Sequence, residues 1–346
     1  MMRTTVFLVV LRLLISFAPG AQERLLTHVI DTGPGHASVT EIPGGFYMVY
    51  DTGHWNHDGE VSERILEVIP RNEAVDLLVL SHSDADHVSA TDEIFERRRV
   101  HTVLRTGLRR RTQAWRDADR AIRDAVEAGD TAVLNLRHNR IAPGTEFPLG
   151  SATVTFLAGD DCPNQYDDVL PGSGECANRS KARNAGSIVL RLEYAGKSIL
   201  FTGDAVGRHD DAPADAKAIA TEKELLSRQG EFTIDSDVII APHHGADNAS
   251  SAAFIKAVSP KWVIFSAGSD NEHPRQSTAH RYLSHGVEVE RILRTDLGDN
   301  EGAEEWDHGR TEEGDVVGDD EIVIVICADS TLTVDYADAL SSTCKP

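Results

Sequence analysis

The sequence has few cysteines and few basic residues for its length, and each shortage excludes a class of protein. Its 346 residues contain four cysteines and no C-x-x-C pair, so a cysteine-ligated metal site is not expected. The 34 Lys and Arg residues are outnumbered by 56 Asp and Glu residues, which gives a formal charge of −22. This balance does not supply the basic footprint that extended nucleic acid needs. It suits a secreted or salt-adapted protein that self-repulsion keeps soluble.

Long apolar runs are also missing, apart from one interrupted run at the N terminus. It covers residues 6–18, contains Arg12 and Ser16, and is followed by small residues. This layout predicts a secretory signal peptide over residues 1–20, with an uncleaved N-terminal anchor as the alternative. The remaining residues, 21–346, contain no stretch of transmembrane length. We therefore expect a secreted or periplasmic protein whose mature chain has no membrane span.

The even number of cysteines agrees with export to an oxidising compartment. Cys162 and Cys176 bracket a segment rich in Pro, Gly, Asn and Asp, and Cys327 and Cys344 bracket the last strands and the tail. Three pairings of the four cysteines are open. We favour 162–176 together with 327–344, because each of these bonds closes a short local loop.

Strand-like and helix-like segments alternate along the chain, which predicts an α/β protein. Strands are expected over residues 25–31, 38–42, 46–51, 76–80, 100–104, 131–136, 152–157, 184–192, 198–203, 238–241, 262–266, 321–327 and 331–336. Helices are expected over residues 61–69, 91–99, 112–128, 215–228, 250–258 and 275–285. Residues 159–185 and 295–320 are expected to be loops, and the first is long enough to shape a substrate site.

The most informative stretch is a short apolar run that is followed at once by four potential metal ligands. Residues 77–80 read Leu-Leu-Val-Leu, as in a strand that is buried on both faces. His82, Asp84, Asp86 and His87 follow within six positions. Two imidazoles and two carboxylates held together favour a cation between them. The alternative is a solvated acidic loop with stray histidines.

This stretch resembles the H-x-[HD]-x-D-H signature of the metallo-β-lactamase fold superfamily. With Asp at the second variable position, it is most similar to the hydrolase domain of the ComEC competence proteins. The resemblance covers roughly residues 25–290 in motif order and spacing. It implies a four-layer αββα sandwich, with residues 21–346 forming a single hydrolase domain. The membrane channel that accompanies the ComEC hydrolase domain has no counterpart in this sequence.

Two further motifs follow apolar strands. Phe201-Thr202-Gly203-Asp204 resembles the family's [LF]-[LF]-T-G-D, whose Asp bridges two metals. A carboxylate at the end of an apolar strand cannot stay in the core unpaired, which also favours a ligand role for Asp204. Pro242-His243-His244-Gly245 resembles V-P-H-H-G-S. We expect His243 to bind metal and His244 to contact the ligands or the substrate.

The resemblance implies a centre with two divalent ions, and its carboxylate content favours zinc or manganese. The expected ligands are His82, Asp84, Asp86, His87, Asp204 and His243. The first ion would be held by His82 and Asp84, with Asp204 shared between the two ions. True β-lactamases supply a third histidine to that ion. Asn184 and Ser187 stand in this region instead, as in the N-x-x-S of ComEC-type sequences, and are expected to contact substrate or ligands.

Three other positions match the family's surrounding motifs. Asp51 resembles an Asp that supports the metal loop from behind. His36 replaces the usual Asp of V-G-Q-G-D-A, so a structural or surface role is expected for it. His273 lies in a segment similar to S-x-G-x-x-N-x-x-x-HP, where it could bind a phosphoryl oxygen or protonate a leaving group. A capping role before the helix over residues 275–285 is the alternative for His273.

The implied chemistry is hydrolysis by a metal-activated water. Asp86 is expected to orient the nucleophile or accept a proton, and no G-x-S-x-G elbow offers a serine instead. The resemblance favours a phosphodiester substrate, as for a nuclease or a nucleotide phosphodiesterase. A lactone or β-lactam hydrolase is the alternative, and a non-catalytic binding protein is a third reading. Arginines at residues 97–99, 105 and 109–111 are a candidate basic cluster, although they read more simply as helix and loop surface.

Overall fold

The computed structural model describes residues 23–54, 58–160, 180–210, 212–268, 271–297, 302–306 and 320–340, together with Cys344. The expected signal peptide over residues 1–20 and the expected bond between Cys162 and Cys176 lie outside the described residues.

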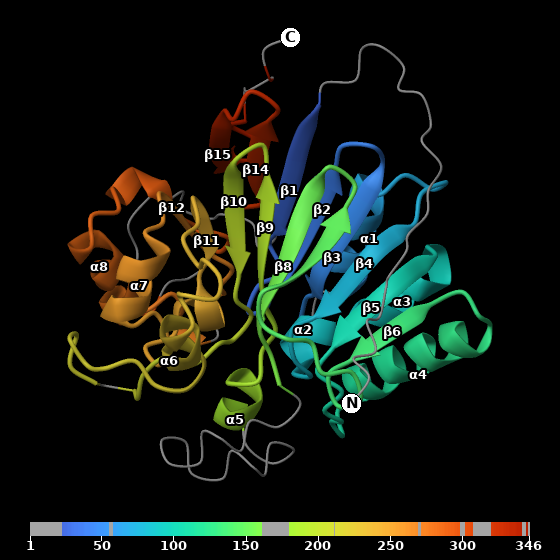
Figure 1. Ribbon diagram of the computed structural model, residues 1–346, viewed down its shortest axis with the longest axis horizontal. Coiled ribbons are helices and arrows are strands. Elements are labelled where there is room, and N and C mark those ends of the chain that lie inside the picture. Colours follow the sequence, from blue (N-terminus) through green and yellow to red (C-terminus); the bar gives the residue numbers. More distant parts are fainter. Residues whose placement is uncertain are drawn as a thin grey trace.

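Two mixed β-sheets form the centre of the molecule (Figure 1). The eight-stranded sheet has the order β15 (Leu332–Tyr336), β14 (Ile322–Cys327), β1 (Arg24–Ile30), β2 (Ala37–Ile42), β3 (Phe46–Thr52), β4 (Val75–Leu80), β5 (Val100–Arg105), β6 (Ala132–Asn135). The seven-stranded sheet has the order β13 (Ile292–Arg294), β12 (Trp262–Phe265), β11 (Val238–Ile240), β10 (Lys197–Phe201), β9 (Val189–Tyr194), β8 (Ala152–Ala158), β7 (Thr145–Leu149).

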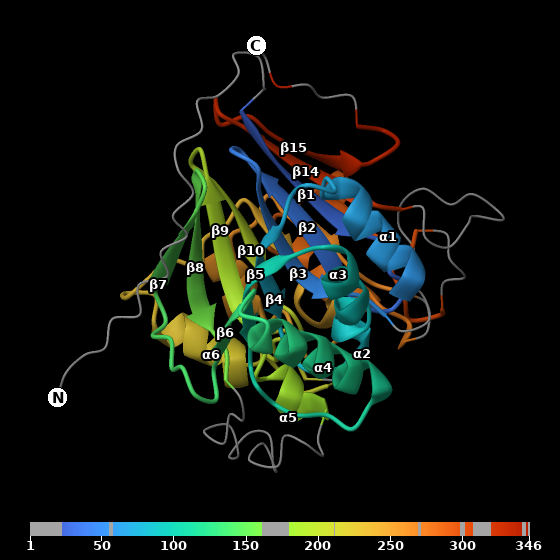
Figure 2. The same ribbon diagram turned by 90° about the vertical axis from the view of Figure 1, so that its right-hand side faces the viewer.

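Helices connect the strands and cover the outer faces of both sheets (Figure 2). The α-helices are α1 (Asp58–Val68), α2 (Ala85–Val88), α3 (Thr91–Arg97), α4 (Gln113–Glu127), α5 (Ser180–Asn184), α6 (Ala220–Ser227), α7 (Ala252–Val258) and α8 (Gln276–Ser284), and the 3₁₀ helices include η3 (Pro242–Gly245) and η5 (Val289–Arg291). Within the described part of the chain, no helix has both the length and the apolar character needed to cross a membrane.

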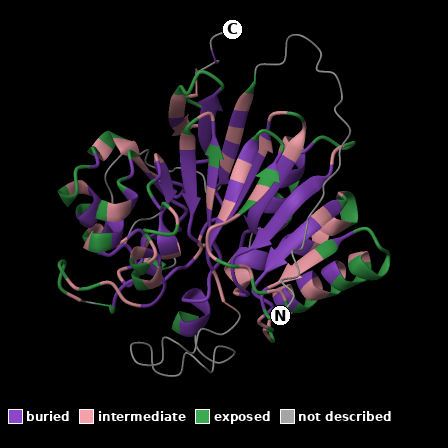
Figure 3. Ribbon diagram, in the orientation of Figure 1, coloured by how far each residue is buried: buried purple, intermediate pink, exposed green. Residues whose placement is uncertain are grey.

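Three apolar clusters separate four layers. Alternate side chains of β4 enter two of these clusters. Val79 packs between the two sheets, and Leu78 and Leu80 pack under the helices of the first sheet. Trp115 of α4 belongs to that outer cluster, and Phe254 of α7 belongs to the matching cluster on the second sheet. Figure 3 shows the result, with buried strands inside and helices that are exposed on their outer sides. The expected αββα sandwich is confirmed.

Three expected segments differ from the structure. The strand expected over residues 184–192 begins only at Val189. The long loop expected over residues 159–185 contains α5, and the helix expected over residues 215–228 begins only at Ala220. Strands β7 and β13 were not expected. Both are edge strands, and a short edge strand gives little periodic signal in the sequence.

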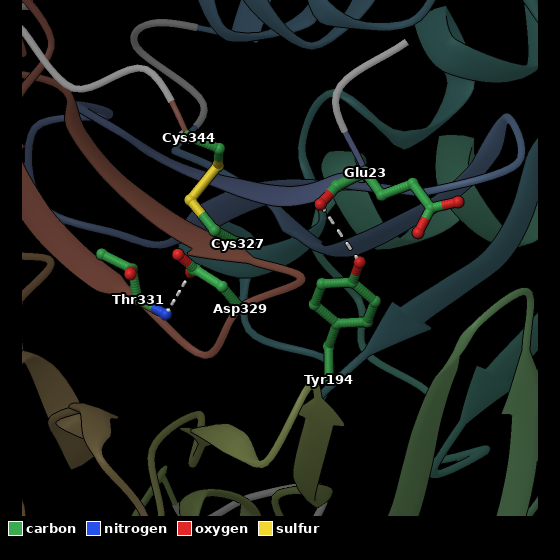
Figure 4. Close-up of a disulfide and its surroundings, with 6 residues drawn as sticks. All are labelled: Glu23, Tyr194, Cys327, Asp329, Thr331 and Cys344. Carbon is green, nitrogen blue, oxygen red and sulfur yellow. Dashed lines mark hydrogen bonds between the residues drawn. A yellow bond between two sulfur atoms is a disulfide. The ribbon is translucent and has the colours of Figure 1, made fainter. Parts of the chain in front are cut away.

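The expected bond between Cys327 and Cys344 is present and ties the tail to the end of β14 (Figure 4). Beside it, the hydroxyl of Tyr194 donates a hydrogen bond of 3.3 Å to the carbonyl oxygen of Glu23, which connects the second sheet to the start of β1.

A buried carboxylate joins α1 to the first sheet. Glu321 accepts bonds of 2.5 and 2.8 Å from the guanidinium of Arg64 and lies 2.6 Å from Nδ1 of His28. Burial alone would raise the pKa of Glu321, but Arg64 and His28 lower it from 4.5 to about 2. The charged form is therefore favoured by folding, and it stabilises the protein above the unfolded pKa.

We expect Glu321→Gln to reduce the free energy of unfolding by about 1–3 kcal/mol at neutral pH, because it breaks a largely buried ion pair. The deficit should shrink as the pH falls from 4.5 towards 2, where wild-type Glu321 also becomes neutral. Urea unfolding of both proteins at several pH values measures it. Glu67→Gln is the matched control, since Glu67 contacts the same arginine but its side chain is 65% exposed. A deficit that stayed constant with pH would contradict the assignment.

Candidate metal centre

The candidate site lies where the carboxyl ends of strands from both sheets meet. Strands β3 and β4 are parallel neighbours in the first sheet, and β10 and β11 are parallel neighbours in the second. The loops after β4, β10 and β11 carry His82, Asp204 and the His243-His244 pair. Helices α2 and α5 lie at this same end (Figure 1). Residues that are far apart in sequence are thereby brought together.

Four side chains form one compact group of potential ligands: Asp86, His87, Asp204 and His244. One donor atom from each lies within 4.8 Å of the others. Oδ1 of Asp204 is 3.1 Å from Nε2 of His87 and 3.3 Å from Nε2 of His244, and the two imidazole nitrogens are 3.2 Å apart. Tetrahedral ligands about 2.1 Å from an ion are separated by roughly 3.4 Å, so these spacings fit a divalent cation.

Hydrogen bonds behind the group fix the two imidazoles. Nδ1 of His87 lies 2.8 Å from Oδ2 of Asp51, and Nδ1 of His244 lies 2.7 Å from the carbonyl oxygen of Ser266. Because these oxygens are acceptors, Nδ1 carries a proton in each ring, and Nε2 is the nitrogen that can bind a cation once it is deprotonated. Asp51 also accepts two bonds of 2.7 Å from the amide and hydroxyl of Ser81. It therefore supports the metal loop from behind, as expected.

A second, looser set of donors faces the other oxygen of Asp204. Oδ2 of Asp204 is 3.7 Å from Nε2 of His82, 3.6 Å from Nε2 of His243 and 3.2 Å from Nδ2 of Asn184. Among the described residues, Nε2 of His82 and Oδ1 of Asn184 are buried without a hydrogen-bond partner. Orphaned polar atoms are costly unless a ligand satisfies them. The two sides of Asp204 together fit a two-metal centre.

The structure places the two consecutive histidines on different sides of Asp204. His244 belongs to the compact group, whereas His243 lies on the looser side with its Nδ1 2.6 Å from Oδ1 of Asn248. Both histidines have positive φ angles, 51° and 54°, and Gly245 follows at 82°. This left-handed turn directs the two rings to different sides of Asp204. Asn248 was not foreseen, because no sequence motif marks it. Ser266 begins the segment that resembles S-x-G-x-x-N-x-x-x-HP, but no role for its carbonyl group was predicted.

Asp84, which was expected to bind metal, pairs with two arginines in the structure. Its carboxylate accepts bonds of 2.6 and 3.1 Å from Arg183 and a further bond from Arg110. Burial alone would raise the pKa of Asp84, but His82 and the two arginines lower it to about 2. Arg110 and Arg183 thus occupy the Asp84 carboxylate in this structure, and no sequence motif pointed to partners so distant in the chain.

The charges in this group favour the binding of a cation. Burial alone would raise the pKa of Asp204, but the four surrounding imidazoles hold it well below its usual range. Burial alone would lower the pKa of His87, yet Asp204 and Asp51 raise it well above the usual value. Burial lowers the pKa of His82 and of His244, which keeps those rings neutral. A proton on His87 occupies the place that a metal ion would take.

The remaining expected residues surround the centre. The hydroxyl of Ser187 accepts a bond of 3.1 Å from the amide of Asp204 and lies 3.5 Å from Nδ1 of His82. His36 is buried rather than on the surface, and its amide donates to the carbonyl oxygen of Asp86 at 3.1 Å. The ring of His273 lies 5.9 Å from that of His243, and burial together with the neighbouring imidazoles lowers its pKa to about 2.

A cleft of about 980 Å³ adjoins the looser side of the centre. Asn184, His243 and His273 line it where it meets Asp204. Four Lys and Arg side chains and three Asp and Glu side chains line it further out. A molecule in this cleft would reach the candidate metal centre directly.

Several solved structures resemble this chain in fold. The metallo-beta-lactamase fold protein YhfI from Bacillus subtilis gives a TM-score of 0.44 at 12% identity, covering 78% of this chain and 97% of that one. CmlA, a diiron beta-hydroxylase from Streptomyces venezuelae, gives a TM-score of 0.46 at 14% identity, covering 81% of this chain and 54% of that one.

Curated relatives include competence proteins, as the sequence motifs predicted. Competence protein ComA of Neisseria gonorrhoeae is 34% identical over 116 residues, which are 33% of this chain and 14% of that protein. ComE operon protein 3 of Bacillus subtilis is 23% identical over 301 residues, covering 78% of this chain and 31% of that protein. The chain thus spans less than a third of the length of either relative. A family model described as the metallo-beta-lactamase superfamily matches residues 30–268. Because this match covers more than half of the sequence, the chain belongs to the metallo-β-lactamase superfamily, whose members are generally metal-dependent hydrolases.

Proposed function

We propose that this protein is a hydrolase that uses two divalent ions to cleave a small phosphodiester or a nucleotide. The observation that carries the substrate class is the charge of the cleft. Lys and Arg are outnumbered 34 to 56 by Asp and Glu in the whole sequence, but they lead four to three among the residues that line the cleft. These cations are paired with carboxylates, Lys181 with Asp210, Arg208 and Arg281 with Asp247, and Arg275 with Glu272 and Glu304, so the cleft is close to neutral on a strongly acidic chain. A near-neutral cleft beside a metal centre repels an anionic substrate less than an acidic surface would.

The size of the substrate follows from where the other arginines lie. Ion pairs interrupt the candidate basic cluster of the sequence. Arg97 is paired with Glu63, Arg105 with Asp119, and Arg110 with Asp84. Since extended nucleic acid requires a continuous track of uncompensated cations, a small substrate that fits the cleft is the better match.

Both sides of Asp204 offer imidazole nitrogens and carboxylate oxygens. This mixed donor set supports zinc, with manganese as the second choice. Asp86, His87, Asp204 and His244 would hold one ion, and His82 and His243 would share Asp204 with the other. Such ions lower the pKa of water and polarise a phosphoryl oxygen.

The chain's own side chains would orient the reacting groups. The Asp86 side chain, 30% exposed, can accept a proton from the attacking water. His273 lines the cleft, where its N–H can donate to a phosphoryl oxygen or a leaving group. Nδ2 of Asn184 lies 3.1 Å from Nε2 of His243 and can contact the substrate beside that histidine. We also propose that the protein works outside the cytoplasm, which the Cys327–Cys344 bond supports.

The test compares three substrates with protein loaded with zinc or manganese. We expect kcat/KM for bis-p-nitrophenyl phosphate to exceed that for nitrocefin or a simple lactone by at least about tenfold. Faster opening of nitrocefin or the lactone would overturn the proposed substrate class and favour the alternative hydrolase. Bound metal without turnover of any of the three would favour a binding protein.

Two matched lysines test the role of the cleft charge. Lys181 lines the cleft and pairs with Asp210, whereas Lys261 pairs with Asp237 at the opposite end of β11. The two side chains are 54% and 56% exposed. Lys181→Gln should raise KM for the phosphodiester by about two- to fivefold, and Lys261→Gln should leave it unchanged. Equal KM values in both variants would remove the electrostatic support for a phosphodiester.

A further inference from the structure

Hydrogen-bond donors occupy all the acceptor sites of the Asp84 carboxylate. Oδ1 accepts bonds from Nε of Arg183 at 2.6 Å and from Arg110, and Oδ2 accepts from Nη2 of Arg183 at 3.1 Å and from the hydroxyl of Ser180 at 3.2 Å. A carboxylate offers about four lone-pair sites, so four donors use its capacity. Asp84 is also missing from the compact group that contains its neighbour Asp86.

The partner of Asp84 comes from the short helix that borders the looser side of the centre. Arg183 belongs to α5 (Ser180–Asn184) and is buried, with its side chain 6% exposed. The next residue, Asn184, contacts both Oδ2 of Asp204 and Nε2 of His243. A shift of Arg183 would therefore move Asn184 directly.

Helix α5 depends on such outside contacts for its position. A helix of five residues is too short to be stable by its own hydrogen bonds. The bidentate pair between Asp84 and Arg183 attaches it to the metal loop, and the hydroxyl of Thr221 holds its end through a bond of 2.8 Å to the carbonyl oxygen of Ala185. Charge-assisted bidentate pairs are among the strongest and most directional side-chain contacts.

We propose that Asp84 is a positioning residue, not a metal ligand, and that its bond to Arg183 holds Asn184 against the looser side of the metal centre. This role rests on the proposed function, because it concerns the affinity of that side for its ion. The compact group needs no help from Asp84, since its imidazoles are fixed by Asp51 and by the Ser266 carbonyl.

The test is a stepwise metal titration of chelator-treated protein by calorimetry, for the wild type, Asp84→Asn, Arg183→Gln and the double variant. Each single variant should bind as many ions as the wild type at saturation, with an affinity for the weaker ion reduced by about tenfold and an unchanged affinity for the tighter ion. The double variant should be no worse than the singles, because both remove the same contact. Thermal unfolding of the metal-free proteins accompanies the titration.

The outcomes separate the two roles. One ion fewer in Asp84→Asn but not in Arg183→Gln would show that Asp84 is a ligand and would overturn the proposal. A lower melting temperature with both ion affinities unchanged would also overturn it, in favour of a purely structural pair. If Asp84→Asn failed to fold, Arg183→Gln alone would decide, because only a positioning role weakens one ion selectively. A wild type that bound no ion would instead overturn the proposed function, and this proposal with it.

Discussion

Asp204→Ala is expected to remove most of the bound metal and to lower kcat/KM by about three orders of magnitude or more. The reason is that Asp204 faces both sides of the centre, with Oδ1 3.1 Å from Nε2 of His87 and Oδ2 3.6 Å from Nε2 of His243. Without Asp204, the compact group consists of imidazoles and a single carboxylate, that of Asp86. One carboxylate attracts a cation less strongly than two. Mass spectrometry of the purified protein measures the metal content, and hydrolysis of bis-p-nitrophenyl phosphate measures the activity.

Asp237→Ala is the control for this variant. Asp237 is a carboxylate of the same sheet, but it lies at the opposite end of the strands, where it accepts a bond of 3.1 Å from the amide of Ser198 and pairs with Lys261. Its loss should leave metal content and activity intact. If Asp204→Ala kept two ions per chain, the shared carboxylate would not be the centre of the site.

Asp51→Asn is expected to weaken metal binding by about 10- to 100-fold without unfolding the protein. Asp51 is fully buried and receives Nδ1 of His87 at 2.8 Å. An amide group there can present its own N–H to the ring, which would move the ring proton to Nε2, the atom that faces the cation. Competition with a chelator of known affinity measures the effect on the wild type and the variant.

Asp76 offers a close match to Asp51 as a control. It is also buried in the first sheet, where it accepts a bond of 2.9 Å from the amide of Tyr47 and lies 3.1 Å from Nδ1 of His101. Asp76→Asn should cost comparable stability but leave the metal affinity unchanged. Equal losses of affinity in both variants would assign the effect to folding and not to the support of His87.

The sequence predicted the site best where a local pattern determines the structure. An apolar run such as residues 77–80 must end before the charged side chains that follow it, so the strand and its loop could be placed from the residues alone. The same reasoning located Asp204 at the end of β10. Both loops were expected to meet because the motifs resemble a known fold, and the structure brings them to within 3.1 Å at His87 and Asp204.

Other features of the site could not be predicted from local patterns in the sequence. The side of Asp204 that each of His243 and His244 faces depends on the positive φ angles of both residues, and no motif indicates such a backbone. The pairing of Asp84 with Arg183 spans 99 positions, and no local pattern in the sequence indicates it. Helix α5 was missed for a similar reason, since its five residues carry no helical periodicity and are held by partners elsewhere in the chain.

The origin of the donors has a consequence for how the protein matures. Asp86 and His87 follow β4 of the first sheet, whereas Asp204 and His244 follow β10 and β11 of the second, and 157 positions separate His87 from His244. Contacts of such long range form late, after loop closure has been achieved. The first sheet itself includes β14 and β15 from the C-terminal part of the chain, so we expect the protein to retain an ion only once both sheets have assembled. A fragment that ends before His244 lacks a member of the compact group, and we expect it to bind metal more weakly than the whole chain.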